Sequence, residues 1–109
     1  MVEWLYNVVL TKLARKKLTK MARDVAEHSS PATAKRVRKD LLGAAVKLEN
    51  LPHSKPKLPG TEDLDYEVRY TKSRKYKIIF RILESLGLVR VLTIRHDAED
   101  PDDVLNDIR

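Results

Sequence analysis

A proline-rich stretch at Pro52–Gly60, PHSKPKLPG, divides the chain where its hydrophobic period changes. Before this stretch, apolar residues recur at spacings of three and four, which is typical of helices. After it, apolar and polar residues alternate, which is typical of strands with one buried face. The prolines and the glycine in the stretch itself predict a loop. Helices are therefore expected in the first half of the chain and most of a sheet in the second.

The first half predicts two helices joined by a short turn. Thr11 can cap a helix that runs to about His28, and Ser30 with Pro31 can start a second helix that runs to Pro52. Because the turn is so short, the two helices are expected to be antiparallel. Their apolar stripes are Ala14, Leu18, Met21 and Val25 in the first helix, and Ala34, Val37, Leu41 and Leu48 in the second.

Strands are predicted on both sides of these helices. Trp4–Leu10 is rich in Trp, Tyr and Val and is too short to be a helix. Three further strands are predicted at 64–71, 76–83 and 88–95, and Pro101 can open a short terminal helix. The order β-α-α-β-β-β predicts an α+β fold, with the N-terminal strand and two antiparallel helices packed on one face of a mainly antiparallel sheet. The other face is then expected to be open and basic.

The 109 residues are expected to form one domain, 1–109, because a chain of this length leaves little room for a second core. Its 22 Lys and Arg against 16 Asp and Glu give a net charge of +6, which favours a polyanionic or acidic partner. The charge is uneven, since residues 1–96 carry +11 and the acidic segment 97–109 carries −5. That segment can fold against a basic groove or remain a solvated end, and we favour the solvated end.

Several classes of function are disfavoured by residues that the sequence lacks. There is no cysteine, and His28, His53 and His96 are too scattered to suggest metal ligands, so neither a metal nor a small-molecule cofactor is expected. No apolar run approaches the roughly 20 residues that span a bilayer. The first residues carry the reverse of a secretory signal's charge order. We therefore expect a cytoplasmic protein that does not enter a membrane.

Basic side chains recur on the predicted sheet and on the proline-rich loop. Alternation along the strands is expected to bring several of them to the face opposite the helices, as a cationic concavity. For Arg69, cross-strand pairing with Glu67 or Glu84 is the structural alternative. The cations of the concavity are Arg69, Lys77, Arg81 and Arg95 from the sheet and Lys55 and Lys57 from the loop, together with His53 and His96.

The first predicted helix carries a second group of cations. On its polar face lie Lys12, Arg15, Lys16, Lys20 and Arg23. The ordinary interpretation of such a group is the solvated face of an amphipathic helix, and contact with a ribosome or DNA is the alternative.

Four stretches of the chain, in this order, resemble the RelE/ParE superfamily of type II toxins, small proteins that a co-expressed antitoxin neutralises. They are the short basic first helix, SPATAKRVRKDLLGAAVKLENLP, YEVRYTKSRKYKIIF and RVLTIRHDAEDP, and they cover nearly the whole chain. The resemblance implies an antitoxin as partner and one of two activities. RelE-, HigB- and YoeB-like members are ribosome-dependent mRNA endoribonucleases, whereas ParE-like members inhibit DNA gyrase, and a shared fold does not decide between them.

The ribonuclease branch implies roles for four residues of this chain. Lys77 stands where these members often carry a phosphate-binding Arg, and Arg69 resembles a second clamp. His96 matches a terminal-strand His, to which we assign proton transfer, and His53 would be its partner base. The remaining cations are expected to bind nucleic-acid phosphates, namely Lys55, Lys57, Arg81 and Arg95.

Two departures from the ribonuclease pattern favour ParE-like sequences. Glu99 stands where a cation is usual, and Leu105 occupies the neighbourhood of a terminal Tyr. We nevertheless expect a type II toxin that is a metal-independent, ribosome-dependent mRNA endoribonuclease and inhibits translation. The alternatives are a ParE-like inhibitor of DNA gyrase and a catalytically inactive binding protein with the toxin fold.

Overall fold

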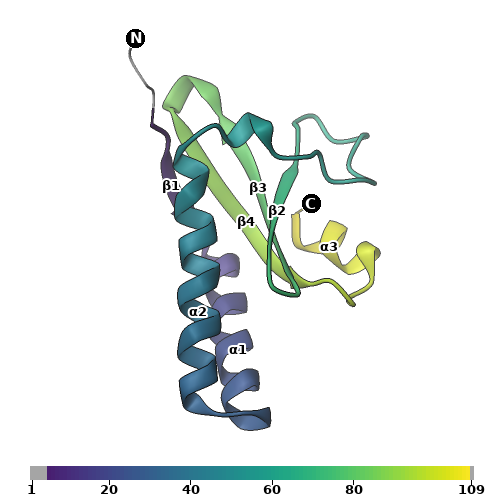
Figure 1. The fold of residues 1–109 in the computed structure, drawn as a ribbon. Helices are drawn as coiled ribbons and strands as arrows, with labels where there is room; N and C mark the ends of the chain where they lie inside the picture. Colours follow the sequence, from purple (N-terminus) through teal and green to yellow (C-terminus); the bar gives the residue numbers. More distant parts are fainter. Residues whose placement is uncertain (1–4, 109) are drawn as a thin grey trace.

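The computed structural model describes residues 5–108, which form a sheet with helices on both of its faces (Figure 1). The α+β class, the β-α-α-β-β-β order and the terminal helix that begins at Pro101 are confirmed. Short 3-10 turns lie at Lys47–Glu49, Pro52–Ser54 and Glu84–Leu86. The helices and strands are β1 (Asn7–Leu10), α1 (Lys12–His28), α2 (Pro31–Val46), β2 (Arg69–Ser73), β3 (Tyr76–Leu83), β4 (Leu88–His96) and α3 (Pro101–Ile108).

The sheet has the strand order β1-β4-β3-β2. Strands β2, β3 and β4 form an antiparallel meander, and β1 pairs with β4 in parallel, with Asn7 opposite Leu88. The predicted mainly antiparallel sheet is therefore confirmed. Its central strand β4 is apolar on both sides of its pleat, as a strand covered on two faces must be.

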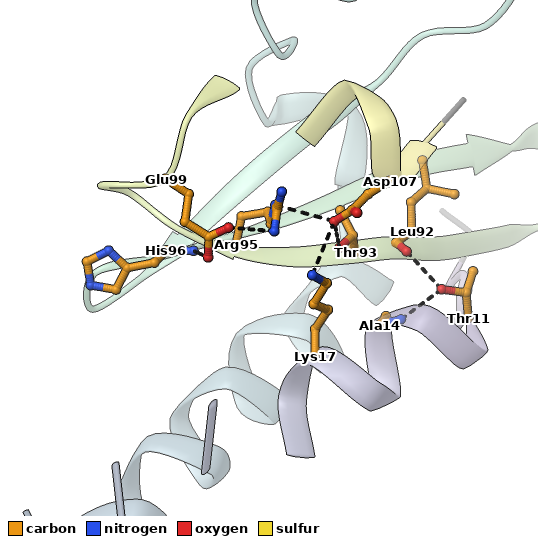
Figure 2. Close-up of polar contacts among 9 residues, drawn as sticks. All are labelled: Thr11, Ala14, Lys17, Leu92, Thr93, Arg95, His96, Glu99 and Asp107. Atoms are coloured by element: carbon orange, nitrogen blue, oxygen red, sulfur yellow. Dashed lines mark hydrogen bonds and ion pairs between the residues drawn. The ribbon is translucent and has the colours of Figure 1, made fainter. Parts of the chain in front are cut away.

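Both helix starts follow from their capping residues. The Thr11 hydroxyl accepts a hydrogen bond from the Ala14 N–H and donates one to the Leu92 carbonyl, which ties α1 to β4 (Figure 2). The Ser30 hydroxyl accepts from the Thr33 N–H, and Pro31 is the first residue of α2. The α1 prediction and the start of α2 are confirmed.

Helix α2 ends earlier than predicted. It stops at Val46, and the chain continues through the 3-10 turn at Lys47–Glu49 instead of reaching Pro52. Leu51, which precedes that proline, has a φ of 47° and lies in the left-handed region. Because a residue before proline avoids the right-handed helical region, the helix cannot extend up to Pro52.

The main core lies between the helical pair and one face of the sheet, as predicted. Apolar residues of α1 and α2 pack there against alternate residues of β3 and β4. Phe80 is fully buried at its centre. The buried residues of this core are Ala14, Leu18, Met21, Val37, Leu41, Ala45, Leu48, Ile78, Phe80, Val89, Val91 and Ile94.

The opposite face of the sheet is not open, and that prediction is wrong. Ile79 on this face is fully buried beneath Val104 and Ile108 of α3 and the segment that contains Leu58 and Val68. Val104 and Ile108 are four residues apart, so they form one apolar stripe on α3. Apolar residues on the second sheet face therefore attract the terminal helix as a cover.

The predicted strand at 64–71 is wrong in its first half, because β2 begins only at Arg69. Leu64 and Tyr66 pack beside the second core from an irregular segment. Their alternation reflects this packing, not strand pairing. Strand β2 instead runs on to Ser73, and the turn into β3 shrinks to two residues. The N-terminal strand likewise begins at Asn7, and the Trp4 of its predicted range lies outside the described residues.

Candidate functional site

The strand register divides the predicted cations between two faces of the sheet. Arg69 lies opposite Phe80, a residue of the main core, whereas Lys77 lies opposite Arg95. Lys77 and Phe80 are three residues apart on β3, so their side chains project to opposite faces. The prediction that Arg69 and Lys77 share a face is wrong, because the two-residue turn pairs Ser73 with Tyr76 and fixes this register.

The two histidines proposed as a catalytic pair lie at opposite ends of β3. His96 is opposite Tyr76, the first residue of β3, whereas His53 pairs with Glu84, which follows the last. An eight-residue strand at about 3.3 Å per residue separates these ends by more than ~20 Å. They cannot act on one phosphate, so the prediction of a single concavity holding both is wrong.

His53 belongs to a small exposed cluster at its own end of the sheet. Its Nε2 pairs with the Glu84 carboxylate, which also accepts a hydrogen bond of 2.9 Å from the Tyr6 hydroxyl. The rings of Tyr6 and His53 lie edge to face, with centroids 5.9 Å apart. The hydrogen bond to Glu84 raises the pKa of Tyr6, since removing the hydroxyl proton would place two negative charges together.

Lys77 and Arg95 are paired across β3 and β4, and both line a pocket of about 270 Å³ on the α3 side of the sheet. It lies where β3 begins and β4 ends, and the chain that follows β4 closes it. The predicted residues in its lining are Lys77, Arg95 and His96. The others are Leu58, Pro59, Ile79, Asp97, Glu99, Pro101, Val104 and Leu105.

Arg95 is held by the chain's own carboxylates (Figure 2). Its side chain is only 10% exposed. Nη1 lies 2.5 Å from Glu99 Oε2, and Nε lies 3.3 Å from Asp107 Oδ2. Asp107 also accepts a hydrogen bond from the Thr93 hydroxyl and lies 3.8 Å from the Lys17 ammonium. A buried guanidinium requires such partners.

The acidic segment therefore folds against the sheet, and the expectation of a solvated end is wrong. Its carboxylates join α3 to β4 through Arg95 and to α1 through Lys17. The carboxylates of Asp97, Glu99 and Asp107 thereby lie beside cations of the sheet and of α1.

Lys77 is also engaged from within the chain. Its ammonium lies 5.3 Å from the centre of the Tyr70 ring and 3.9 Å from Asp97 Oδ1. The other oxygen of Asp97 lies 3.2 Å from the Lys72 ammonium. Asp97 thus bridges two lysines, and an added phosphate would meet a carboxylate at this position.

The hydrogen bonds of His96 fix which ring nitrogen is free. Nδ1 lies 3.0 Å from the Ala98 backbone nitrogen and accepts its N–H, so the neutral ring carries its proton on Nε2. The ring also meets Tyr76 edge to face, with centroids 5.3 Å apart. Because the only lone pair of the ring is already bonded, His96 is not arranged to take up a proton from a substrate in this conformation.

Arg69 and its neighbours hold the loop to the sheet. The guanidinium donates to the Lys55 carbonyl at 2.6 Å and to Glu67 at 3.1 Å, so the structural pairing with Glu67 is observed. Lys57 lies 3.1 Å from the same carboxylate. The Lys57 hydrogen bond and charge, with a smaller contribution from Arg69, lower the pKa of Glu67.

Arg81 likewise supports the second core. Its guanidinium carbon lies 4.0 Å from the centre of the Tyr66 ring, a cation–π contact. The Tyr66 hydroxyl in turn donates to the Ile108 carbonyl at the end of α3. Arg81 therefore joins β3 to the irregular segment and the terminal helix.

A groove between α2 and β2 is not evident from the sequence. Arg74 there is paired with Asp40 at 2.8 Å. Lys55 is the one predicted residue that lines it, and the spacing of the other cations along the sequence gives no sign that they meet. The cations that line it are Lys39, Lys47, Lys55, Lys72 and Arg74. Asp97 and Asp107 are likewise not evident as site residues, although the acidic segment as a whole is visible in the sequence.

Two classes of feature are absent from the part of the chain that the structure describes. Within residues 5–108, no three His, Asp or Glu side chains gather where they could hold a metal ion. Over the same residues, no helix has the length and apolar character needed to cross a bilayer.

Comparison with known proteins gives the family. Residues 8–101 match the model of a family described as the ParE toxin of the type II toxin-antitoxin system parDE. The chain belongs to the ParE toxin family. This agrees with the RelE/ParE resemblance of its four sequence stretches. Comparison with curated proteins finds no significant match.

Solved structures share the fold at low sequence identity. A chromosomal ParDE toxin-antitoxin system from P. aeruginosa has a chain 14% identical, with a TM-score of 0.69 over 84% of this chain and 96% of that one. The RelBE2 toxin-antitoxin complex of Mycobacterium tuberculosis has a chain 21% identical, with a TM-score of 0.62 over 87% of this chain and 94% of that one. A mutant of the E. coli toxin RelE in the free state is 19% identical, with a TM-score of 0.63 over 95% of this chain and 94% of that one. At these identities the comparisons establish the fold alone.

Proposed function

We propose that this type II toxin acts as the resemblance to ParE-like members implies, by inhibiting DNA gyrase, and not by cutting mRNA. The observation that supports the proposal is the engagement of Lys77 and Arg95 by carboxylates of the same chain. Asp97, Glu99 and Asp107 occupy the positions around these cations that a phosphate would need.

RNA cleavage through the ribose 2′-hydroxyl needs a base, an acid and cations that stabilise charge on the phosphate. Arg95 is buried between two carboxylates, and releasing a buried partner of this kind costs about 3–5 kcal/mol. His96 has its lone pair bonded, and His53 lies at the other end of β3. Arg95 and the two histidines are therefore not free for these roles, and the Lys77 ammonium has a carboxylate oxygen 3.9 Å away.

Inhibition of an enzyme by a bound protein requires fewer precisely placed groups than RNA cleavage does. It needs a surface that is complementary to the target and no catalytic group. The contacts of Asp107 with Arg95 and Lys17 hold α3 in one position on the sheet.

The ribosome-dependent ribonuclease is the second candidate. It is favoured by the presence of Lys77, Arg95 and His96 in the lining of one pocket. It requires that ribosome binding move the segment after β4, so that the two cations become free.

A cognate antitoxin is the expected partner for either activity. The solved ParDE and RelBE2 relatives are described as a toxin-antitoxin system and complex. The groove between α2 and β2 suits an acidic segment of such a protein, because its lysines outnumber its single carboxylate, Asp40.

The proposal is tested by adding the chain to a translating extract and reading two signals from one sample. Primer extension on a reporter mRNA detects cleavage, and plasmid topology detects gyrase inhibition. We expect intact mRNA and blocked supercoiling. Cuts that require ribosomes, and that disappear in Lys77→Ala and His96→Ala, would overturn the proposal and establish the ribonuclease.

A further inference from the structure

The outward face of α1 carries a group of cations that the proposed function does not use. All of them are exposed, and together with Thr19 they line one shallow depression. None of them forms an ion pair with any residue between 5 and 108. We call this group the α1 stripe, and it consists of Lys12, Arg15, Lys16, Lys20 and Arg23.

The α1 stripe is held in a fixed position by the core behind it. Ala14, Leu18 and Met21 on the opposite side of the helix are buried against α2 and the sheet. The Thr11 cap ties the start of the helix to β4. The helical pair also extends past the end of the sheet, so the outer part of α1 is unobstructed (Figure 1).

The charge density of the α1 stripe is similar to that of one strand of a DNA duplex. Lys12 and Arg23 are eleven residues apart, or about 16 Å along a helix that rises about 1.5 Å per residue. Five cations over this length give about one per 4 Å. One strand of a DNA duplex carries one phosphate per roughly 3.4 Å of its axis.

The surroundings of the stripe favour a duplex over a protein or a single strand. Protein interfaces depend on buried aromatic and aliphatic anchors, and none of the large exposed apolar residues lies on α1. Single-stranded nucleic acids are bound by aromatic side chains on which bases stack. Helix α1 has no Phe, Tyr or Trp, and its one histidine, His28, is its last residue, whereas a duplex backbone needs only an array of fixed cations.

We propose that the α1 stripe binds the phosphate backbone of double-stranded DNA without regard to sequence. The choice of DNA over an RNA duplex rests on the proposed function, because gyrase holds DNA. Direct contact with DNA itself goes beyond that function.

The test is fluorescence anisotropy of the purified chain with a labelled 20-base-pair DNA duplex. With five phosphate contacts, affinity is expected to fall about 500-fold between 50 and 200 mM salt, a slope near −4.5 on logarithmic axes. A variant with all five stripe residues changed to Gln is expected to lose most of this slope. Gln keeps a good helix propensity, and circular dichroism checks that the variant is folded.

The matched control changes five exposed cations to Gln that lie outside the α1 stripe and outside the groove between α2 and β2, which removes the same charge. These are Lys35, Arg36, Arg38, Lys75 and Arg90. The control is expected to keep most of the affinity and slope. Equal losses in both variants, unchanged binding by the stripe variant, or tighter binding to an RNA duplex of the same sequence would each overturn the proposal.

The duplex experiment contains no gyrase, so its result is independent of the proposed function. A chain that blocks gyrase but does not bind the duplex overturns the DNA surface alone. A chain that binds the duplex through the α1 stripe but leaves gyrase active supports the stripe and overturns the proposed function alone.

Discussion

Asp107 joins more elements than any other single side chain in the network around Arg95. One carboxylate contacts Thr93 and Arg95 on β4 and Lys17 on α1 (Figure 2). Removing a carboxylate partner from a buried cation leaves its charge uncompensated. Asp107 is therefore expected to contribute to stability well beyond an ordinary surface residue.

We predict that Asp107→Ala lowers the free energy of unfolding by about 3 kcal/mol, the lower end of the range for a broken buried pair, because Glu99 still holds Arg95. Denaturant unfolding measures this. The matched control is Asn106→Ala, an exposed position on the same helix, where a change within about 0.5 kcal/mol is expected. Similar losses at both positions would show that the network adds no stability.

Thr11 is the residue on which the start of α1 depends. We predict that Thr11→Ala costs about 1–2 kcal/mol, because it removes both the cap on Ala14 and the bond to Leu92. Thr19→Ala on the exposed face of the same helix is the control, and it is expected to change stability much less. Thermal unfolding of the two variants compares them, and equal shifts would count against the cap.

At the scale of elements, the sequence predicts a segment well when local chemistry decides it. The Ser30–Pro31 start of α2 and the apolar stripe of α1 are examples. The strand prediction is wrong at 64–68 because the alternating residues there pack beneath α3, which is distant in the sequence. The predicted end of α2 at Pro52 is wrong, because Leu51 takes a left-handed conformation before this proline.

The loop between α2 and β2 is expected to respond to acid. Lys57 and Arg69 lower the pKa of Glu67, so this carboxylate stabilises the fold when ionised. That contribution is present above the ordinary pKa of a glutamate and is lost as the pH falls through the lowered value. Thermal unfolding followed from pH 7 to about pH 3 should show a smaller fall in Tm on acidification for Glu67→Gln than for the parent chain.

The control for the acid experiment is Glu27→Gln, an exposed glutamate near the end of α1. The fall in Tm of this control variant on acidification is expected to equal that of the parent chain. If Glu67→Gln also follows the parent chain, then the contacts of Glu67 with Lys57 and Arg69 contribute nothing measurable to holding the loop.

At the scale of the whole molecule, the residue types of the candidate site are predictable from the sequence, but their contacts and separations are not. The residue types near the end of β4 are visible as a motif, and Lys77, Arg95 and His96 do line one pocket. Their partners are not visible, because the position of α3 depends on apolar packing against Ile79. The separation of His53 from His96 follows from the length of β3 and from the path of the loop.

We propose that this chain inhibits gyrase, whereas its own carboxylates engage the cations of the pocket. The most direct measurement is the supercoiling of relaxed plasmid by purified gyrase and ATP, with increasing amounts of the chain. We expect that supercoiling stops even in the absence of ribosomes and mRNA. Unchanged supercoiling at a molar excess of the chain, with cleavage of translated mRNA by the same preparation, would contradict it.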